Sequence, residues 1–277
     1  MASLKGHIKH SLAEWCFCGA GEQWPFDRLL KAAVELGVPS IELCDEANWP
    51  ALKDHGLTNA LVLPGMPGAQ FMTGFNNMRY RDQLMEVTTA TIKKCEKFGF
   101  PNVLAFTGYK YKDAHDPNSG EISKEECAKL TIDGLKKIAP IAEAHGVTMC
   151  LEHLNTRDDT HPMKGHPGYQ GDDLDFMSMI VREVNSPNVK LLFDIYHVQV
   201  MHGDVIRRLR KEFDIIGHIH TAGCPGRNEL NDKQEINFPA IMNVIVELGY
   251  KGYVGHEFIP TGDTLAGIKQ AVALCDV

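Results

Sequence analysis

The stretch AEAHGVTMCLEHLN, residues 142–155, contains a helix end, a glycine stop and an apolar strand that closes on a carboxylate. Gly146 follows the helical pattern directly, and glycine readily adopts the left-handed conformation that ends helices. The short apolar run from Val147 then ends at Glu152. A helix, a tight turn and a short apolar strand are the repeating parts of a parallel sheet covered by helices.

The same pattern recurs along the chain, with further glycine stops in ELGVPS, KFGFPN and ELGYKGY. Candidate strands occupy residues 7–13, 40–44, 59–63, 102–106, 147–152, 190–194, 215–220 and 253–258. Helical periodicity occupies residues 26–36, 79–98, 124–145, 174–184, 205–212, 239–248 and 265–274, with a weaker helix at 49–55. This alternation predicts one (β/α)8 TIM barrel domain over residues 1–277, with a doubly wound sheet as the alternative.

The composition is that of an ordinary globular protein, with 44% hydrophobic and 23% charged residues among 277. A formal net charge of −8 argues against nucleic acid as a partner, because binding phosphate backbones requires clustered Lys and Arg. The apolar runs are far shorter than the roughly 20 residues that a membrane span needs. We therefore expect neither nucleic acid nor membrane as a partner.

The N-terminal sequence MASLKGHIKH lacks the features of a secretory signal, so we expect a cytoplasmic location. The eight cysteines contain no CxxC pair, and in a chain of this length they do not indicate a disulfide framework. We expect reduced cysteines that pack in the interior.

Four successive apolar runs end in a side chain that can bind a metal. They read VTMCLEHLN with Glu152, VKLLFDIYH with Asp194, IIGHIHTAG with His220 and YVGHEFIP with Glu257. In a parallel barrel the functional groups lie at the carboxyl ends of the strands, so these four side chains should point into the barrel mouth. Three carboxylates that converge in a buried site repel one another, and a divalent cation between them would offset this repulsion. Oxygen-rich ligation with one nitrogen favours Mn²⁺, Mg²⁺ or Co²⁺, while Zn²⁺ and Fe²⁺ stay possible.

These motifs resemble the xylose-isomerase-like barrels, and within them the hydroxypyruvate isomerases and the ketose 3-epimerases. The resemblance rests on LEHLN, FDIYHVQ, GHIHTAGCPGR, QEINFPAIM and GHEFIP, and the match spans nearly the whole chain. It implies that Glu152 and Glu257 both bind the metal and transfer the proton, and that Asp194 and His220 complete the metal site. Hydroxypyruvate isomerases commonly carry Gln at the position of His220, so in this respect the chain is similar to the epimerases.

The resemblance also implies substrate contacts for His197 and Arg227, although a packing histidine and a surface arginine are the simpler interpretations. Trp15, after the first strand, either lines a sugar-sized pocket or belongs to the core. His218 is expected to be a hydrogen-bond partner behind the ligands rather than a ligand. The polar loop 156–171 is either a lid over the site or a plain connection, and its histidines have too little context to be assigned.

We therefore expect an isomerase or 3-epimerase that acts on a small sugar or hydroxy-ketone through a cis-enediolate. A metal-dependent dehydratase of a keto-polyol and a non-catalytic sugar-binding barrel are the alternatives. An endonuclease IV-like hydrolase shares the spacing of Asp194 and His197, but the Asp-x-His pair expected after His220 is absent from the sequence, which reads Arg227, Asn228, Glu229. A homo-oligomer, either a dimer or a tetramer, is possible.

Overall fold

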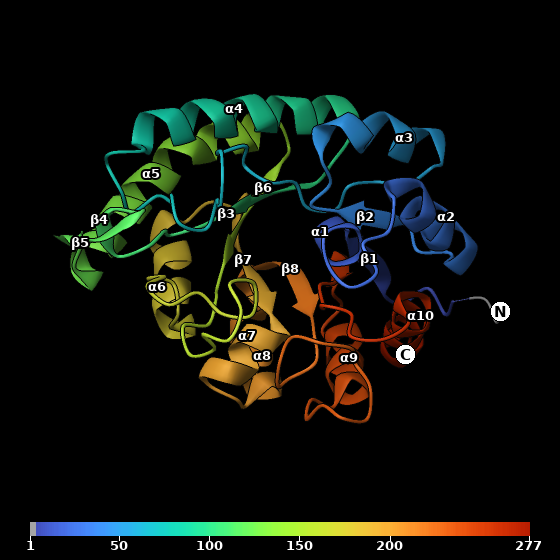
Figure 1. Ribbon diagram of the computed structural model, residues 1–277. Helices are drawn as coiled ribbons and strands as arrows, with labels where there is room; N and C mark the ends of the chain where they lie inside the picture. The colour runs from blue at the N-terminus through green and yellow to red at the C-terminus, as the bar shows by residue number, and fades with distance from the viewer. Residues whose placement is uncertain (1–3) are drawn as a thin grey trace.

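The computed structural model describes residues 4–277 and contains a curled parallel sheet surrounded by helices (Figure 1). Within these residues the sheet has seven strands in the order β2-β1-β9-β8-β7-β6-β3. The strands are β1 (Lys9–Ala13), β2 (Ser40–Glu42), β3 (Asn102–Ala105), β6 (Thr148–Glu152), β7 (Val189–Asp194), β8 (Ile216–Thr221) and β9 (Tyr253–His256). All neighbouring pairs are parallel, so the strands present their carboxyl ends on one side of the sheet.

The segment 58–62 closes the gap between β2 and β3. Its backbone accepts hydrogen bonds from Ile41 N at 3.1 Å and Leu43 N at 2.8 Å, and Val62 exchanges two further bonds with the backbone of β3. The expected strand at 59–63 is therefore reduced to isolated bridges in the eighth barrel position. Pro64, which has no amide hydrogen, and Gly65, with φ +100°, turn the chain away before a longer ladder can form. The predicted TIM barrel is thereby confirmed.

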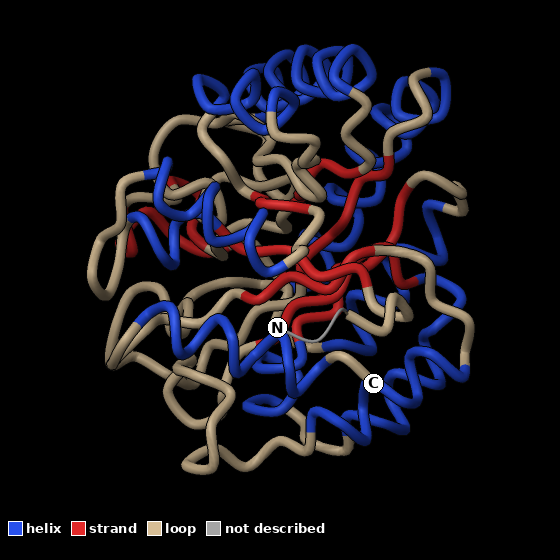
Figure 2. Tube along the Cα trace, turned by 90° about the vertical axis from the view of Figure 1, so that its right-hand side faces the viewer, coloured by secondary structure: helices blue, strands red, loops and turns tan. Residues whose placement is uncertain are grey.

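Helices form an outer layer around the strands, as Figure 2 shows in a view turned by 90° from that of Figure 1. The longer ones are α2 (Phe26–Leu36), α4 (Arg81–Phe98), α5 (Lys124–Ala144), α6 (Leu174–Val184), α8 (Val205–Glu212), α9 (Phe238–Glu247) and α10 (Thr264–Cys275), and α3 (Trp49–Asp54) is short. Two of the predicted helix ends are confirmed at glycine: Gly37 ends α2 and Gly99 ends α4, both in the left-handed conformation. The two ends of the described chain lie together, because Lys5 N donates to Asp276 Oδ1 at 3.0 Å.

Several short elements were not expected from the sequence. A hairpin of β4 (Tyr111–Asp113) and β5 (Asp116–Glu121) follows β3, and its largely exposed polar residues lack the apolar alternation that marks a strand. Two short helices, α1 (Glu14–Cys18) and α7 (Ile195–Met201), begin directly at the ends of β1 and β7. Two 3-10 turns, η1 (Glu46–Asn48) and η2 (Phe213–Ile215), precede α3 and β8.

The eight cysteines, all of which lie in the described part of the chain, are free, as the sequence predicts. In residues 4–277 we find no helix that combines the length and the apolar character required to cross a bilayer.

Candidate metal centre

Four strand-end side chains meet at the mouth of the barrel. Glu152, Asp194, His220 and Glu257 come from the ends of four neighbouring strands, and each offers a ligand atom within 4.8 Å of the others. His220 Nδ1 lies 3.8 Å from Glu152 Oε1 and 2.8 Å from Glu257 Oε2. All four are buried. The structure thus brings together the residues that the sequence singles out.

Several of these ligand atoms are buried and make no hydrogen bond, although His220 Nδ1 lies at ion-pair distance from Glu257 Oε2. Glu152 Oε1, Asp194 Oδ2 and His220 Nδ1 have no hydrogen-bond partner among residues 4–277. The other oxygen of Asp194 is occupied, because Oδ1 caps α7 by accepting from Tyr196 N at 2.8 Å. Buried polar atoms are nearly always satisfied in folded proteins. Three orphaned atoms that face one another therefore fit a cation held by two carboxylates and one imidazole, with Glu257 beside them.

The two glutamates differ in their protonation equilibria. Burial, together with the charges of Glu257 and Asp194, raises the pKa of Glu152 to about 7 against the opposing positive charge of His220. Burial acts in the same direction on Glu257, but the positive charges of Arg227 and His220 lower its pKa to about 2. One carboxylate of the pair is thus held ionised while the other can carry a proton near neutral pH.

Glu42, at the end of β2, is a site residue that the sequence analysis missed. It is fully buried, and its Oε1 lies 2.7 Å from His220 Nε2. The same carboxylate contacts His218 Nε2 at 3.1 Å. His218 thus lies beside Glu42 behind the four clustered residues, and Glu42 is the group that contacts His220 directly. The run PSIELCD contains the signal that could have revealed it, namely a carboxylate at the end of an expected strand.

Arg227 lies at the edge of the cluster, although it belongs to a loop. Its side chain is buried; Nη2 is paired with Glu257 and lies 3.6 Å from Asp194 Oδ2, while Nη1 donates to Met163 O at 2.6 Å. The guanidinium carbon is 5.2 Å from the centroid of the Trp15 ring. Trp15 is half-buried and its Nε1 donates to Glu257 Oε1 at 2.8 Å. Both side chains therefore contact Glu257; Arg227 is buried rather than exposed at the surface, and Trp15 also packs against the hydrophobic core.

His197 points a ring N–H toward the cluster. Its Nδ1 accepts from Asn155 N at 3.1 Å, which leaves the proton on Nε2. That Nε2 has no hydrogen-bond partner in the described chain and lies 3.6 Å from Asp194 Oδ2. Burial and the charge of Arg227 hold the pKa of His197 well below its usual value, so the ring is neutral. It can donate one hydrogen bond to a ligand.

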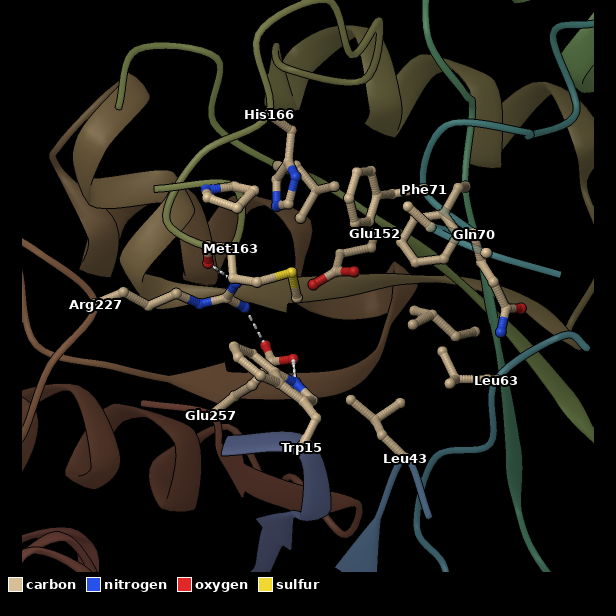
Figure 3. Close-up of a pocket in the computed structure, with 16 residues that line it drawn as sticks. Trp15, Leu43, Leu63, Gln70, Phe71, Glu152, Met163, His166, Arg227 and Glu257 are labelled. Carbon is tan, nitrogen blue, oxygen red and sulfur yellow. Dashed lines mark hydrogen bonds and ion pairs between the residues drawn. The ribbon is translucent and has the colours of Figure 1, made fainter. Parts of the chain in front are cut away.

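A cavity of about 370 Å³ opens above the cluster (Figure 3). Glu152, Glu257, Arg227 and Trp15 line one part of it. The loop 156–171 contributes Pro162, Met163 and His166, so it covers the site as a lid would. His166 is buried here, whereas His161 of the same loop is exposed. Nothing in the local sequence separates these two histidines, because both lie in polar loop without periodicity.

The sequence from residue 30 to residue 275 matches the family of xylose isomerase-like TIM barrels. The chain belongs to this family. The resemblance that the motifs indicate is thereby confirmed. In this xylose isomerase-like barrel the four clustered residues all lie within the matched region.

Named relatives of this barrel include isomerases. A 2-oxo-tetronate isomerase from Cupriavidus necator is 37% identical over 53% of this chain and 54% of the relative. A putative hydroxypyruvate isomerase from Homo sapiens is 33% identical over 53% of this chain and 50% of the relative. The alignments thus span about half the length of these curated relatives. Among solved structures, an AP endonuclease, family 2 from Brucella melitensis has a TM-score of 0.78 at 26% identity, over 94% of this chain and 97% of that chain.

Proposed function

We propose that this xylose isomerase-like barrel is a divalent-metal-dependent isomerase or 3-epimerase of a small sugar or hydroxy-ketone. The observation that carries the proposal is the placement of Glu152 and Glu257. Both carboxylates reach the same small cavity from different strands, and Figure 3 shows them pointing into it from opposite sides. Two carboxylates so placed can remove a proton from one carbon and return it on the other face or to the neighbouring carbon.

The metal would be held by Glu152, Asp194, His220 and Glu257, with Mn²⁺, Mg²⁺ or Co²⁺ preferred over Zn²⁺ or Fe²⁺ by the oxygen-rich ligand set. When bound, it supplies stabilisation of the negative charge that develops on the carbonyl oxygen. Glu257, which Arg227 holds ionised, and Glu152, whose pKa in the metal-free site is raised to about 7, are the two groups that would accept and return the proton.

Three further residues would bind the substrate or hold Glu257 beside it. His197 Nε2–H can donate to a substrate oxygen, and Arg227 and Trp15 keep Glu257 in place beside it. The names of the relatives, a 2-oxo-tetronate isomerase and a putative hydroxypyruvate isomerase, support a small hydroxy-carbonyl substrate and an enediolate route. The cytoplasmic location, the single domain and a homo-oligomeric state stay predictions.

The test is solvent exchange with the two glutamates changed one at a time. Glu152→Gln and Glu257→Gln each keep the size of the side chain but remove the base, so kcat should fall by about two orders of magnitude or more. Ketoses and hydroxy-ketones are incubated with the metal-loaded protein in deuterated water, and deuterium next to the carbonyl is measured by mass spectrometry. Glu22→Gln, at an exposed glutamate outside the cavity, is the matched control and should exchange like wild type.

The same spectra separate the alternatives. An isomerase or epimerase product keeps the mass of the substrate apart from the label, whereas a dehydratase product is lighter by one water. Ligand binding without exchange or loss of water, unchanged in both Gln variants, would replace the proposal by a sugar-binding protein. Cleavage of DNA at abasic sites under the same conditions would favour the hydrolase alternative instead.

A further inference from the structure

Asn155 lies three residues after Glu152, where the loop 156–171 leaves the carboxyl end of β6. Its side chain is fully buried, and it does not line the cavity. We call the loop 156–171 the lid, because Met163 and His166 point from it into the space above the glutamates (Figure 3). Asn155 therefore lies at the base of a segment that covers the site.

Every polar atom of Asn155 contacts either the lid or His197. Its Oδ1 accepts from Asp158 N at 3.0 Å, and its backbone O accepts from His166 N at 2.8 Å. Its Nδ2 donates to Lys164 O at 2.8 Å. These three hydrogen bonds tie an early part and a late part of the lid to one buried residue.

The second hydrogen of Nδ2 faces His197. Asn155 Nδ2 lies 2.7 Å from His197 Nδ1, and Asn155 N lies 3.1 Å from the same atom. The lid fixes the orientation of the amide, because Lys164 O can only accept a hydrogen bond and Asp158 N can only donate one. Both groups that face His197 Nδ1 are therefore donors. The ring must then carry its proton on Nε2.

This proton is the one that a ligand of the site can use. His197 Nε2 has no hydrogen-bond partner in the described chain and lies 3.6 Å from Asp194 Oδ2. Buried donors are nearly always satisfied, so this N–H is available to an oxygen atom of a bound molecule. Rotation of the ring, or a shift of the proton to Nδ1, would take the donor away.

We propose that Asn155 is a positioning residue that couples closure of the lid to the orientation of His197. The inference rests on the proposed function, in which His197 donates to the substrate. With the lid closed, one amide group binds Lys164 O and holds the imidazole ring. With the lid open, the amide loses the carbonyl that fixes its orientation. Such coupling is reciprocal, so a change in the lid must affect His197 as a change at Asn155 does.

Gly165 allows a test from the side of the lid. A Cβ atom at this buried glycine would overlap Asp158 O and Asn155 Oδ1. Gly165→Ala therefore pushes the lid away from Asn155 and changes no group that hydrogen-bonds to His197. Asn155→Ala removes the amide itself and leaves the backbone donor in place.

Two measurements follow the lid and the ring separately. Hydrogen–deuterium exchange with mass spectrometry reports on the lid amides. ¹⁵N NMR of histidine-labelled protein with Mg²⁺ shows which nitrogen of His197 carries the proton, and His197→Gln assigns the signals. We expect the proton of wild-type His197 on Nε2. In Asn155→Ala and Gly165→Ala the lid amides should exchange about tenfold faster or more, and the His197 signals should shift or broaden. Asn243→Ala and Gly262→Ala, at exposed residues outside the cavity, are the matched controls and should behave like wild type.

A proton on Nδ1 of wild-type His197 overturns the inference, and so does a lid that exchanges in Asn155→Ala as it does in wild type. An opened lid in Gly165→Ala with unchanged His197 signals would show that the two are not coupled. Thermal melting checks that the variants are folded. If Asn155→Ala does not fold, the wild-type proton position and Gly165→Ala decide the inference.

Deuterium incorporation into the ketose panel separates this inference from the proposed function. Both variants keep Glu152 and Glu257, so kcat/KM should fall by about tenfold or more through poorer placement of the substrate. Wild-type turnover in folded variants would contradict a positioning role for Asn155. If no ketose exchanges with the wild-type protein, the proposed function fails, whereas the NMR and lid measurements still decide the coupling.

Discussion

His220 uses its two ring nitrogens for different contacts. Nε2 lies 2.7 Å from Glu42 Oε1, and Nδ1 faces Glu152 and Glu257. Burial alone would raise the pKa of Glu42, but the charges of and hydrogen bonds from His218 and His220 hold it well below its usual range. An ionised Glu42 keeps the proton of His220 on Nε2. Without a metal, His220 is a cation that faces Glu257, because, against the effect of burial, the carboxylates around it hold its pKa well above the usual value. A bound metal would displace the proton of Nδ1 and take its lone pair.

Glu42 should therefore act as a positioning residue for the metal site. Glu42→Gln keeps the shape of the side chain but removes the charge that makes His220 a stronger ligand, so Mn²⁺ affinity should fall by about 10- to 100-fold. Titration calorimetry of the metal-free protein measures this directly. Glu46→Gln, an exposed glutamate in η1, is the control and should bind Mn²⁺ like wild type. Equal affinities for Glu42→Gln and wild type would show that His220 is oriented by packing alone.

At the scale of elements, β9 passes very close to the pair of Glu42 and His220. A Cβ atom at Gly255 would overlap Glu42 Oε1 and come within 2.8 Å of His220 Cδ2. Any side chain at this position would therefore displace Glu42 or His220, although the backbone of Gly255 needs no special conformation. This absence of a side chain makes room for the contact between β2 and β8 across the barrel interior.

Gly255→Ala should thus destabilise the fold and disturb the site together. We expect a loss of about 1–3 kcal/mol in the free energy of unfolding, as for other overpacked interiors, and weaker Mn²⁺ binding. Urea denaturation measures the first and calorimetry the second. Gly262→Ala is the matched control, since this glycine is exposed and the nearest atom outside its own chain neighbours would lie 4.0 Å from the new Cβ. A Gly255→Ala protein as stable as this control would mean that Glu42 can move away at little cost.

Folding of the whole molecule brings together charged side chains that lie far apart in the unfolded chain. Four strands that lie far apart in sequence place three carboxylates and an imidazole within 4.8 Å. A cation that binds only this arrangement stabilises the folded protein by mass action, by about 2.7 kcal/mol at a free concentration of 100 times Kd.

Removal of the metal should accordingly lower the melting temperature. For a chain of this size we expect a fall of roughly 5 °C or more on addition of a chelator, and recovery on addition of excess Mn²⁺. Differential scanning calorimetry provides the measurement. Asp194→Asn and His220→Ala should retain less metal after desalting and respond little to the chelator. Full metal occupancy in both variants, by elemental analysis, would contradict the site.

The sequence by itself determined the barrel and the four clustered residues, because these depend on local signals. Periodicity located α2, α6 and α8 to the residue, and the strand-end rule selected Glu152, Asp194, His220 and Glu257. Tertiary structure alone decided the bridging of 58–62, the contact of Glu42 with His220, the pairing of Arg227 with Glu257 and the burial of His166 beside Phe71. Each of these joins segments that are distant in sequence, so neither periodicity nor spacing contains them; they exist only once barrel closure brings the loops of separate strands to one mouth.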